Sequence, residues 1–215
     1  TQGVSSAASD VYKRQRKDDT LSASGTKPDK DTYLLTTSTP LSQLTALRLD
    51  VLTGDTLPLK GPGRQDNGNL TLSEIEAQLF EPGATQPTKL KFSRATADFD
   101  QKDWTAAMAI DGNGATGWGI HPAVGAPHHA VFELAQPVAM KPGAKITIAL
   151  KQLSGRSHLI GSFKLSATDE PVSRVTALPA LAFDALKLPA EKRTDAQRLS
   201  LAAHATRLQH GNLHA

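Results

Sequence analysis

The sequence predicts an all-β fold, a β-sandwich of the jelly-roll type followed by a short C-terminal helical tail. Between Thr20 and about Asp169, short apolar runs alternate with clusters of Gly, Pro, Asn and Asp, which is typical of antiparallel sandwiches. Several runs keep the two-residue period of a strand with one buried face. After Pro171 the apolar residues change to helical spacing. We therefore expect a sandwich over residues 18–172 and a helical tail over residues 173–215.

Six segments carry the clearest strand pattern. Within one of them, Leu47, Leu49 and Val51 fall on one face of the strand. Arg48 and Asp50 fall on the other face, so we expect one buried and one wet face, as in a sandwich. The predicted strands are Thr32–Thr37, Ala46–Leu52, Leu70–Leu79, His129–Leu134, Ile146–Leu150 and Ser162–Ala167.

Two stretches, Asp31–Glu76 and His129–Ala167, contain the same parts in the same order. Each has a strand, a Pro followed by an apolar residue, a second strand, a loop with Gly and Arg, and a third strand. A strand-rich half cannot bury its apolar face alone, so an internal repeat would form one pseudo-symmetric sandwich rather than two small domains. Chance similarity between short strands is the alternative.

The last part of the sequence predicts two short helices. Leu178–Lys187 has apolar residues at helical spacing, and Pro189 follows it. Thr194 offers an N-cap to Asp195–Gln209, and Gly211 closes that segment. The helices have too little apolar area for a core of their own. We therefore expect either a linker that docks on the sandwich or the start of a following domain that is missing.

Residues 1–17 determine the net charge of the chain. They hold four of the 24 basic and one of the 21 acidic residues, so their net charge of +3 equals that of the whole chain. The remaining residues are neutral overall, which argues against a nucleic-acid partner. Val4–Gln15 resembles the translated sequencing-adapter peptide found at the ends of metagenomic reading frames. We therefore expect residues 1–17 to be disordered and non-native.

Composition and motifs exclude several kinds of site. The chain has no Cys, which rules out disulfides, thiolate zinc ligands and cysteine nucleophiles. It has no apolar run of roughly 20 residues, so we expect no membrane insertion, and any export signal would lie upstream of this sequence. Neither Gly-x-Ser-x-Gly nor HExxH occurs, and the neighbours His128 and His129 lack metal-ligand spacing. We therefore expect surface or turn histidines and no enzymatic activity.

One segment combines a strand with an acidic turn. Ser93–Phe99 is followed by Ala109–Trp118, in which Asp111 can accept backbone N–H bonds and Trp118 can pack where the chain re-enters the sandwich. The segment resembles the opening of discoidin-like, galactose-binding-like domains, and a structural role for Asp111 and Trp118 outweighs a ligand contact. In related folds a nearby loop often holds structural calcium. The resemblance therefore implies a candidate calcium site with Asp111 and Asn113 as oxygen donors, although the EF-hand spacing is absent.

Two further segments, Leu57–Glu76 and Gly155–Ser166, extend this resemblance. With the Asp111 turn they resemble a module of large secreted planctomycete proteins that also carry a c-type cytochrome domain, over roughly residues 18–200. The haem-binding motif itself is not present. The resemblance implies a binding or spacer module of a multidomain exported protein, located outside the cell or in the periplasm, and it carries over no catalytic residue.

Two functions are favoured for such a module, and a hydrolase is a third that a cleft with converging carboxylates of perturbed pKa would support. The first is binding of a polysaccharide or glycan, because Arg and Asn side chains offer the paired donors and acceptors that hydroxyls need and Trp offers a stacking surface. The candidate contacts are Arg64, Asn67, Asn69, Trp104, Arg156 and His158. The second is a structural or interaction role that positions neighbouring domains without a small-molecule ligand. An exposed aromatic residue beside Arg64 or Arg156 would favour the first function, and buried loop aromatics would favour the second.

Overall fold

The computed structural model describes residues 3–6, 11–15, 19–171 and 176–210. The chain divides into two units, residues 1–176 and 177–215. The first unit is an all-β sandwich and the second contains two short helices, which confirms the predicted fold class. Within the described residues, no helix combines the length and the apolar character needed to cross a membrane.

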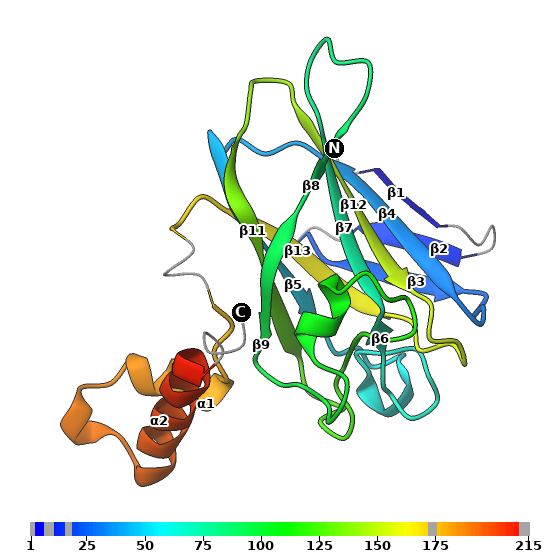
Figure 1. The fold of residues 1–215 in the computed structure, drawn as a ribbon. Coiled ribbons are helices and arrows are strands. Elements are labelled where there is room, and N and C mark those ends of the chain that lie inside the picture. The colour runs from blue at the N-terminus through cyan, green and yellow to red at the C-terminus, as the bar shows by residue number, and fades with distance from the viewer. Residues whose placement is uncertain (1–2, 7–10, 16–18, 172–175, 211–215) are drawn as a thin grey trace. The chain divides into compact units, whose positions relative to one another are not determined.

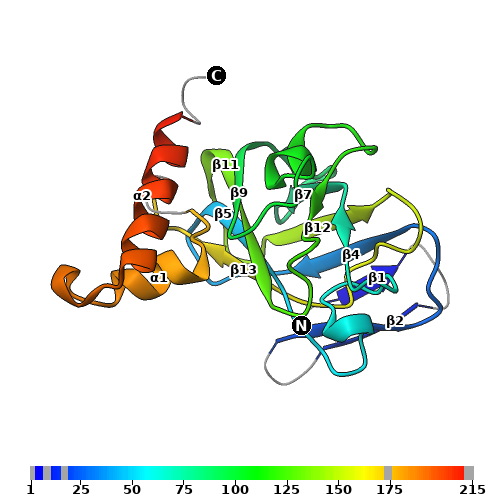
Figure 2. The same ribbon diagram turned by 90° about the horizontal axis from the view of Figure 1, so that it is seen from below.

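Two antiparallel sheets form the sandwich. The five-stranded sheet has the order β1 (Gly3–Ser6), β4 (Asp31–Thr37), β12 (Lys145–Gln152), β7 (Glu74–Phe80) and β8 (Thr88–Leu90). The six-stranded sheet has the order β2 (Val11–Gln15), β3 (Leu21–Gly25), β13 (Ser162–Thr168), β5 (Gln43–Val51), β11 (His128–Ala139) and β9 (Phe92–Ala97). The short strands β6 (Thr71–Leu72) and β10 (Trp118–Gly119) pair with each other. Figure 1 shows β9, β11 and β5 on the left and β4, β7 and β12 on the right, and Figure 2 shows β4 beside β12.

All six predicted strands are present, as β4, β5, β6 with β7, β11, β12 and β13. The strand expected over Leu70–Leu79 is interrupted at Ser73. The N–H of Ser73 donates to the carbonyl of Lys151 at 2.8 Å, and its hydroxyl accepts the N–H of Leu153 at 3.0 Å. The sequence did not predict β3 and β8, because β3 is rich in small polar residues and β8 has three residues.

The hydrophobic core lies between the two sheets. The rings of Tyr33 and Phe163 stack with centroids 5.8 Å apart, and Phe92 meets Phe132 edge to face at 6.0 Å. Alternate residues of β12 are buried, as the two-residue period of a strand predicts. The largest fully buried side chains are Trp118, Tyr33, Phe132, Phe163, Leu21, Leu35, Leu44, Leu47, Leu49, Leu70, Leu72 and Ile120.

The strand pairing fits the predicted internal repeat. In the repeat, β4, β5 and β7 correspond to β11, β12 and β13. β12 pairs with both β4 and β7, and β5 pairs with both β11 and β13. Each stretch therefore contributes its first and third strands to one sheet and its middle strand to the other. This exchange is what a pseudo-symmetric sandwich requires.

Two parts of the segment that we expected to be disordered, residues 3–6 and 11–15, form strands. β1 pairs with β4 from Gly3↔Thr36 to Ser6↔Tyr33, and β2 pairs with β3 along its whole length. Strand edges such as those of β3 and β4 offer unpaired main-chain groups, and an added strand can bond to them with little dependence on its side chains. The non-native origin of this segment stays a prediction.

The second unit contains both predicted helices. They are α1 (Ala180–Leu186) and α2 (Asp195–His210), joined through a short 3-10 turn at Ala190–Lys192. Thr194 caps α2 as expected, since its hydroxyl accepts the N–H of Gln197 at 3.3 Å and the Gln197 side chain accepts the N–H of Thr194 at 3.0 Å. The predicted stop at Gly211 lies outside the described residues.

Candidate functional site

Four loops are joined at one end of the sandwich. They comprise residues 26–30, 52–70, 98–127 and 153–161, and we call them the loop end. The cyan and green loops at the bottom of Figure 1 belong to it. The N–H of Gly125 donates to the carbonyl of Gly61 at 2.6 Å, and the N–H of Ser157 donates to the carbonyl of Asp29 at 3.1 Å. Every candidate site residue from the sequence lies in these loops.

Arg64 is buried inside the loop end. Its exposed fraction is 7 %, and its Nη2 donates to the carbonyls of Gly25 and Thr26 at 2.7 and 3.0 Å. The neighbouring aromatic residue is Tyr33, which is fully buried and whose hydroxyl donates to the carbonyl of Ile160 at 2.8 Å. Burial raises the pKa of Tyr33. A sugar would therefore meet neither the guanidinium nor an exposed ring here.

Asn69 links two loops and is 5 % exposed. Its Nδ2 donates to Oε1 of Gln101 at 3.0 Å, and its Oδ1 accepts the N–H of Ile120 at 3.1 Å. Both polar ends of the amide are therefore used inside the protein. Asn67 is exposed, and its Oδ1 accepts the N–H of Asn69 at 2.9 Å, which closes the turn before β6.

The other three predicted sugar contacts can be reached from solvent. Trp104 is half-buried. It lies in a turn in which its backbone N–H donates to the carbonyl of Gln101 at 2.9 Å. Arg156 has an exposed side chain, while its N–H donates to Oδ1 of Asp29 at 2.7 Å. His158 is half-buried, and its Nδ1 lies 3.0 Å from the carbonyl of Gly155 in the same loop.

Trp118 has the structural role that the sequence predicts. It is fully buried, and its indole N–H donates to the carbonyl of Phe99 at 2.9 Å. A buried indole needs this partner, because an unmade hydrogen bond in the core is costly. Trp118 therefore fixes the start of β10 against the loop that follows β9.

The Asp111 turn is closed by its own side chains. Oδ1 of Asp111 accepts the N–H of Asn113 at 2.8 Å, and Gly112 takes a φ of +81°. The hydroxyl of Thr116 lies 2.8 Å from both Oδ2 of Asp111 and the carbonyl of Asn113. The Thr116 hydroxyl thus lies within hydrogen-bond distance of both a carboxylate oxygen and a carbonyl oxygen.

Glu74, the first residue of β7, lies against this turn. It is 8 % exposed, and its Oε1 is buried without a hydrogen-bond partner. Burial and the adjacent Asp111 carboxylate raise the pKa of Glu74, while the backbone N–H groups of Gly112 and Asn113 act in the opposite direction. Two carboxylates so placed need a proton or a cation between them to avoid repulsion.

The residues at this turn fit a calcium ion. Calcium takes oxygen ligands from carboxylates, backbone carbonyls, hydroxyls and water, and it tolerates irregular geometry. Glu74, Asp111, the Asn113 carbonyl and the Thr116 hydroxyl would hold it, and the ion would supply the charge that the orphan oxygen of Glu74 lacks. Within the described residues no three His, Cys, Asp or Glu side chains gather, so neutral oxygens would have to complete the shell.

A buried contact between His128 and Asp98 joins β11 to the loop after β9, and this corrects the expectation of a surface histidine at position 128. His128 is 9 % exposed, its Nδ1 lies 3.0 Å from Oδ2 of Asp98, and its Nε2 lies 2.7 Å from the carbonyl of Ala123. A carbonyl only accepts, so Nε2 carries a proton, and the carboxylate favours a second proton on Nδ1. Burial opposes the charge, but these two hydrogen bonds outweigh it and raise the pKa of His128.

We expect this ion pair to make stability fall as pH rises. A raised folded pKa means that the contribution of His128 is complete below its ordinary pKa of 6.5 and is lost as pH rises through the folded value. Nuclear magnetic resonance titration of the His128 ring, with urea unfolding on both sides of that range, would measure the effect. The His128→Gln variant should lack this loss of stability. A ring that titrates at or below 6.5 would contradict the ion pair.

Comparisons of the chain with protein-family models, with curated proteins and with solved structures find no significant match.

Sequence reasoning missed Glu74 and the pair of Asp98 with His128. Ile75, Ala77 and Leu79 of β7 are buried, so the alternation places Glu74 on the outer, wet face of its strand. The distant Asp111 turn covers that position, and no local pattern indicates this cover. His128 and Asp98 likewise meet only because β9 and β11 pair.

Proposed function

We propose that this chain is a non-catalytic interaction module of a longer exported protein, where it positions neighbouring parts of that protein outside the cell or in the periplasm. The observation that carries the proposal is the internal use of Arg64 and Asn69. Both are buried, and both bond to other loops instead of presenting donors and acceptors to a ligand. The loop end thus works as a rigid cap.

The energetics favour this role over sugar binding at those positions. A sugar hydroxyl that took the place of Gln101 would have to break a part-buried hydrogen bond. One that displaced the Asn69 amide itself would leave the buried N–H of Ile120 without its acceptor. Such an exchange leaves a buried group unsatisfied, at a cost of about 1–3 kcal/mol. A stiff cap of this kind suits a module whose surface, rather than a pocket in its loops, meets its partners.

We also propose that the Asp111 turn holds a structural calcium ion. The ion would stabilise the turn against β7 and leave the chemistry of the module unchanged. The support is the buried, unpartnered Oε1 of Glu74 next to the Asp111 carboxylate.

Carbohydrate binding is the second candidate function, and the exposure of Trp104 and Arg156 favours it. Trp104 is half-buried, and Arg156 is an exposed residue on a loop held by Asp29. An aromatic ring and a guanidinium each offer a sugar one kind of contact, stacking and paired donors respectively.

Binding of the chain to a panel of polysaccharides and glycans, with and without calcium, decides between the two functions. The matched variants are Trp104→Ala in the loop end and Phe80→Ala, which removes an exposed aromatic ring at the end of β7. We expect no saturable binding from a sample of the chain that is shown to be folded by a cooperative melting transition. Binding lost in Trp104→Ala but kept in Phe80→Ala would replace the proposal with the carbohydrate candidate. Binding kept in both variants would overturn it too, with the sugar site elsewhere.

A further inference from the structure

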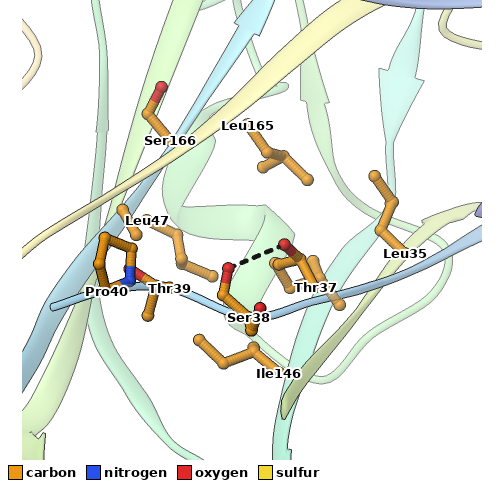
Figure 3. A pocket seen from close by; sticks show the side chains of 11 residues that line it. Leu35, Thr37, Ser38, Thr39, Pro40, Leu47, Ile146, Leu165 and Ser166 are labelled. Carbon is orange, nitrogen blue, oxygen red and sulfur yellow. Dashed lines mark hydrogen bonds between the residues drawn. The ribbon is translucent and has the colours of Figure 1, made fainter. Parts of the chain in front are cut away.

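An apolar pocket opens between the two sheets outside the loop end (Figure 3). Leu35, Ile146 and Ile148 line it from the five-stranded sheet. Leu47 and Leu165 line it from the six-stranded sheet. The pocket measures about 160 Å³. A cavity of about 150 Å³ with aliphatic walls is known to stay dry and to accept a benzene-sized group. This pocket therefore suits one aliphatic side chain.

The described residues at the rim of the pocket are polar and uncharged. Thr37, Ser38, Thr39 and Ser166 supply hydroxyls, and Figure 3 shows the bond from the Thr37 hydroxyl to the carbonyl of Ser38, 3.1 Å long. Among the described residues that line the pocket there is no Asp, Glu, Lys, Arg or His. An occupant that brings a charge to the rim would lose hydration without gaining a partner. The rim therefore selects an uncharged segment.

One wall of the pocket is an edge of β13 that none of the described residues extends with a further strand. β3 pairs only with Ser162 and Phe163 of β13, whereas β5 pairs with β13 as far as Thr168. The carbonyl of Gly161 faces β3 and that of Ser162 faces β5. The main-chain groups of successive residues of β13 therefore point alternately to β3 and to β5. The main-chain groups of Leu165 and Ala167 therefore point away from β5, and no described residue pairs with them.

We propose that an uncharged, extended segment of a partner polypeptide adds to this edge of β13 and inserts an aliphatic side chain into the pocket. The inference rests on the proposed interaction function and names its partner class. Main-chain groups of Leu165 and Ala167 supply the hydrogen bonds to the partner segment. The pocket accommodates the side chain of that segment that points inward, which gives specificity. Ser166 and Ala167 are exposed, so the edge is accessible.

The strand edge distinguishes this occupant from a small apolar molecule. A free alkyl chain would fill the pocket but leave the donors and acceptors of Leu165 and Ala167 unused. A strand satisfies both features at once, and its side chains alternate with the period that places one of them over the pocket. A second copy that pairs through its own β13 is the other source of a strand, and the experiment separates it.

The probe is a heptapeptide with blocked ends in which threonine alternates with leucine. Its binding is measured from the shifts of the protein's backbone amide signals in nuclear magnetic resonance spectra. We expect saturable shifts centred on Leu165 and Ala167. The Ala167→Pro variant removes an outward N–H without touching the bonds to β5, so it should abolish the shifts. Ala167→Ser keeps that N–H and should bind as the unchanged chain does. Leu165→Phe narrows the pocket and should weaken binding at least several-fold.

Controls identify the alternatives. A heptapeptide with aspartate in place of its central leucine should not bind. Equal binding to Ala167→Pro, or shifts only at other strands, would overturn the proposal. Hexanol binding without peptide binding would indicate a small apolar ligand instead, and dimerisation lost in Ala167→Pro would indicate a second copy. Each of these outcomes rejects the partner strand. Glycan binding would contradict the proposed function. The peptide-binding result at the β13 edge could still be interpreted independently of it.

Discussion

Replacing Gly63 with alanine should prevent the sandwich from folding. A Cβ at this position would lie 1.8 Å from the carbonyl oxygen of Asn69 and 2.8 Å from that of Gly68. Both atoms belong to the backbone, so no rotamer change relieves the clash. Gly63 cannot retreat, because its N–H donates to Gly68 at 2.9 Å and it forms a bridge with Ile160. We expect a loss of more than about 4 kcal/mol, which is exceptional for one methyl group.

Gly83→Ala is the matched control for this experiment. Gly83 has a φ of +81°, but no atom lies within 4 Å of its added Cβ. Its replacement should cost only the left-handed backbone penalty, about 1–2 kcal/mol. Circular dichroism melting and urea unfolding would compare the two variants with the unchanged chain. A Gly63→Ala protein that melts close to the Gly83→Ala protein would show that the loop end can rearrange, and would weaken the view of it as a rigid cap.

The Asp111 turn shows what the sequence could predict. Its hydrogen bonds join residues at most five positions apart, as between Asp111 and Thr116. Such bonds depend on local chain geometry, and the Asx turn and the positive φ of Gly112 follow from residue type. The burial of Trp118 also followed, because a large aromatic residue at the re-entry point of a sandwich has few other places to lie.

Arg64 and Asn69 show what the sequence could not predict. Their side chains carry the same donors and acceptors whether they face a ligand or another loop. The choice depends on contacts 39 and 51 positions away, to Gly25 and Ile120. These contacts exist only after the sheets have brought the loops together. Composition therefore shows which polar groups are present, but at these two positions their partners are the protein's own carbonyls and amides.

Calcium should raise the stability of the chain, and Glu74 should be required for the effect. An ion that binds only the folded state stabilises it by about 2.7 kcal/mol at a hundredfold excess over its dissociation constant. Without the ion, the raised pKa of Glu74 means that its charged form opposes folding. The contribution of Glu74 then improves as pH falls through the folded pKa toward the ordinary value of 4.5. Calcium should remove this dependence, because it favours the charged carboxylate.

Two neighbours on β7 make the test specific. Glu74→Gln should abolish the calcium-dependent rise in melting temperature, and it should stabilise the calcium-free chain by removing a buried charge. Glu76→Gln alters the same strand at a half-buried carboxylate whose pKa is lowered by Lys151. This variant should keep the full calcium response, and magnesium should replace calcium poorly, since it demands octahedral geometry. If Glu74→Gln responded to calcium as the unchanged chain does, the ion would bind elsewhere and a proton alone would relieve the Glu74 and Asp111 pair.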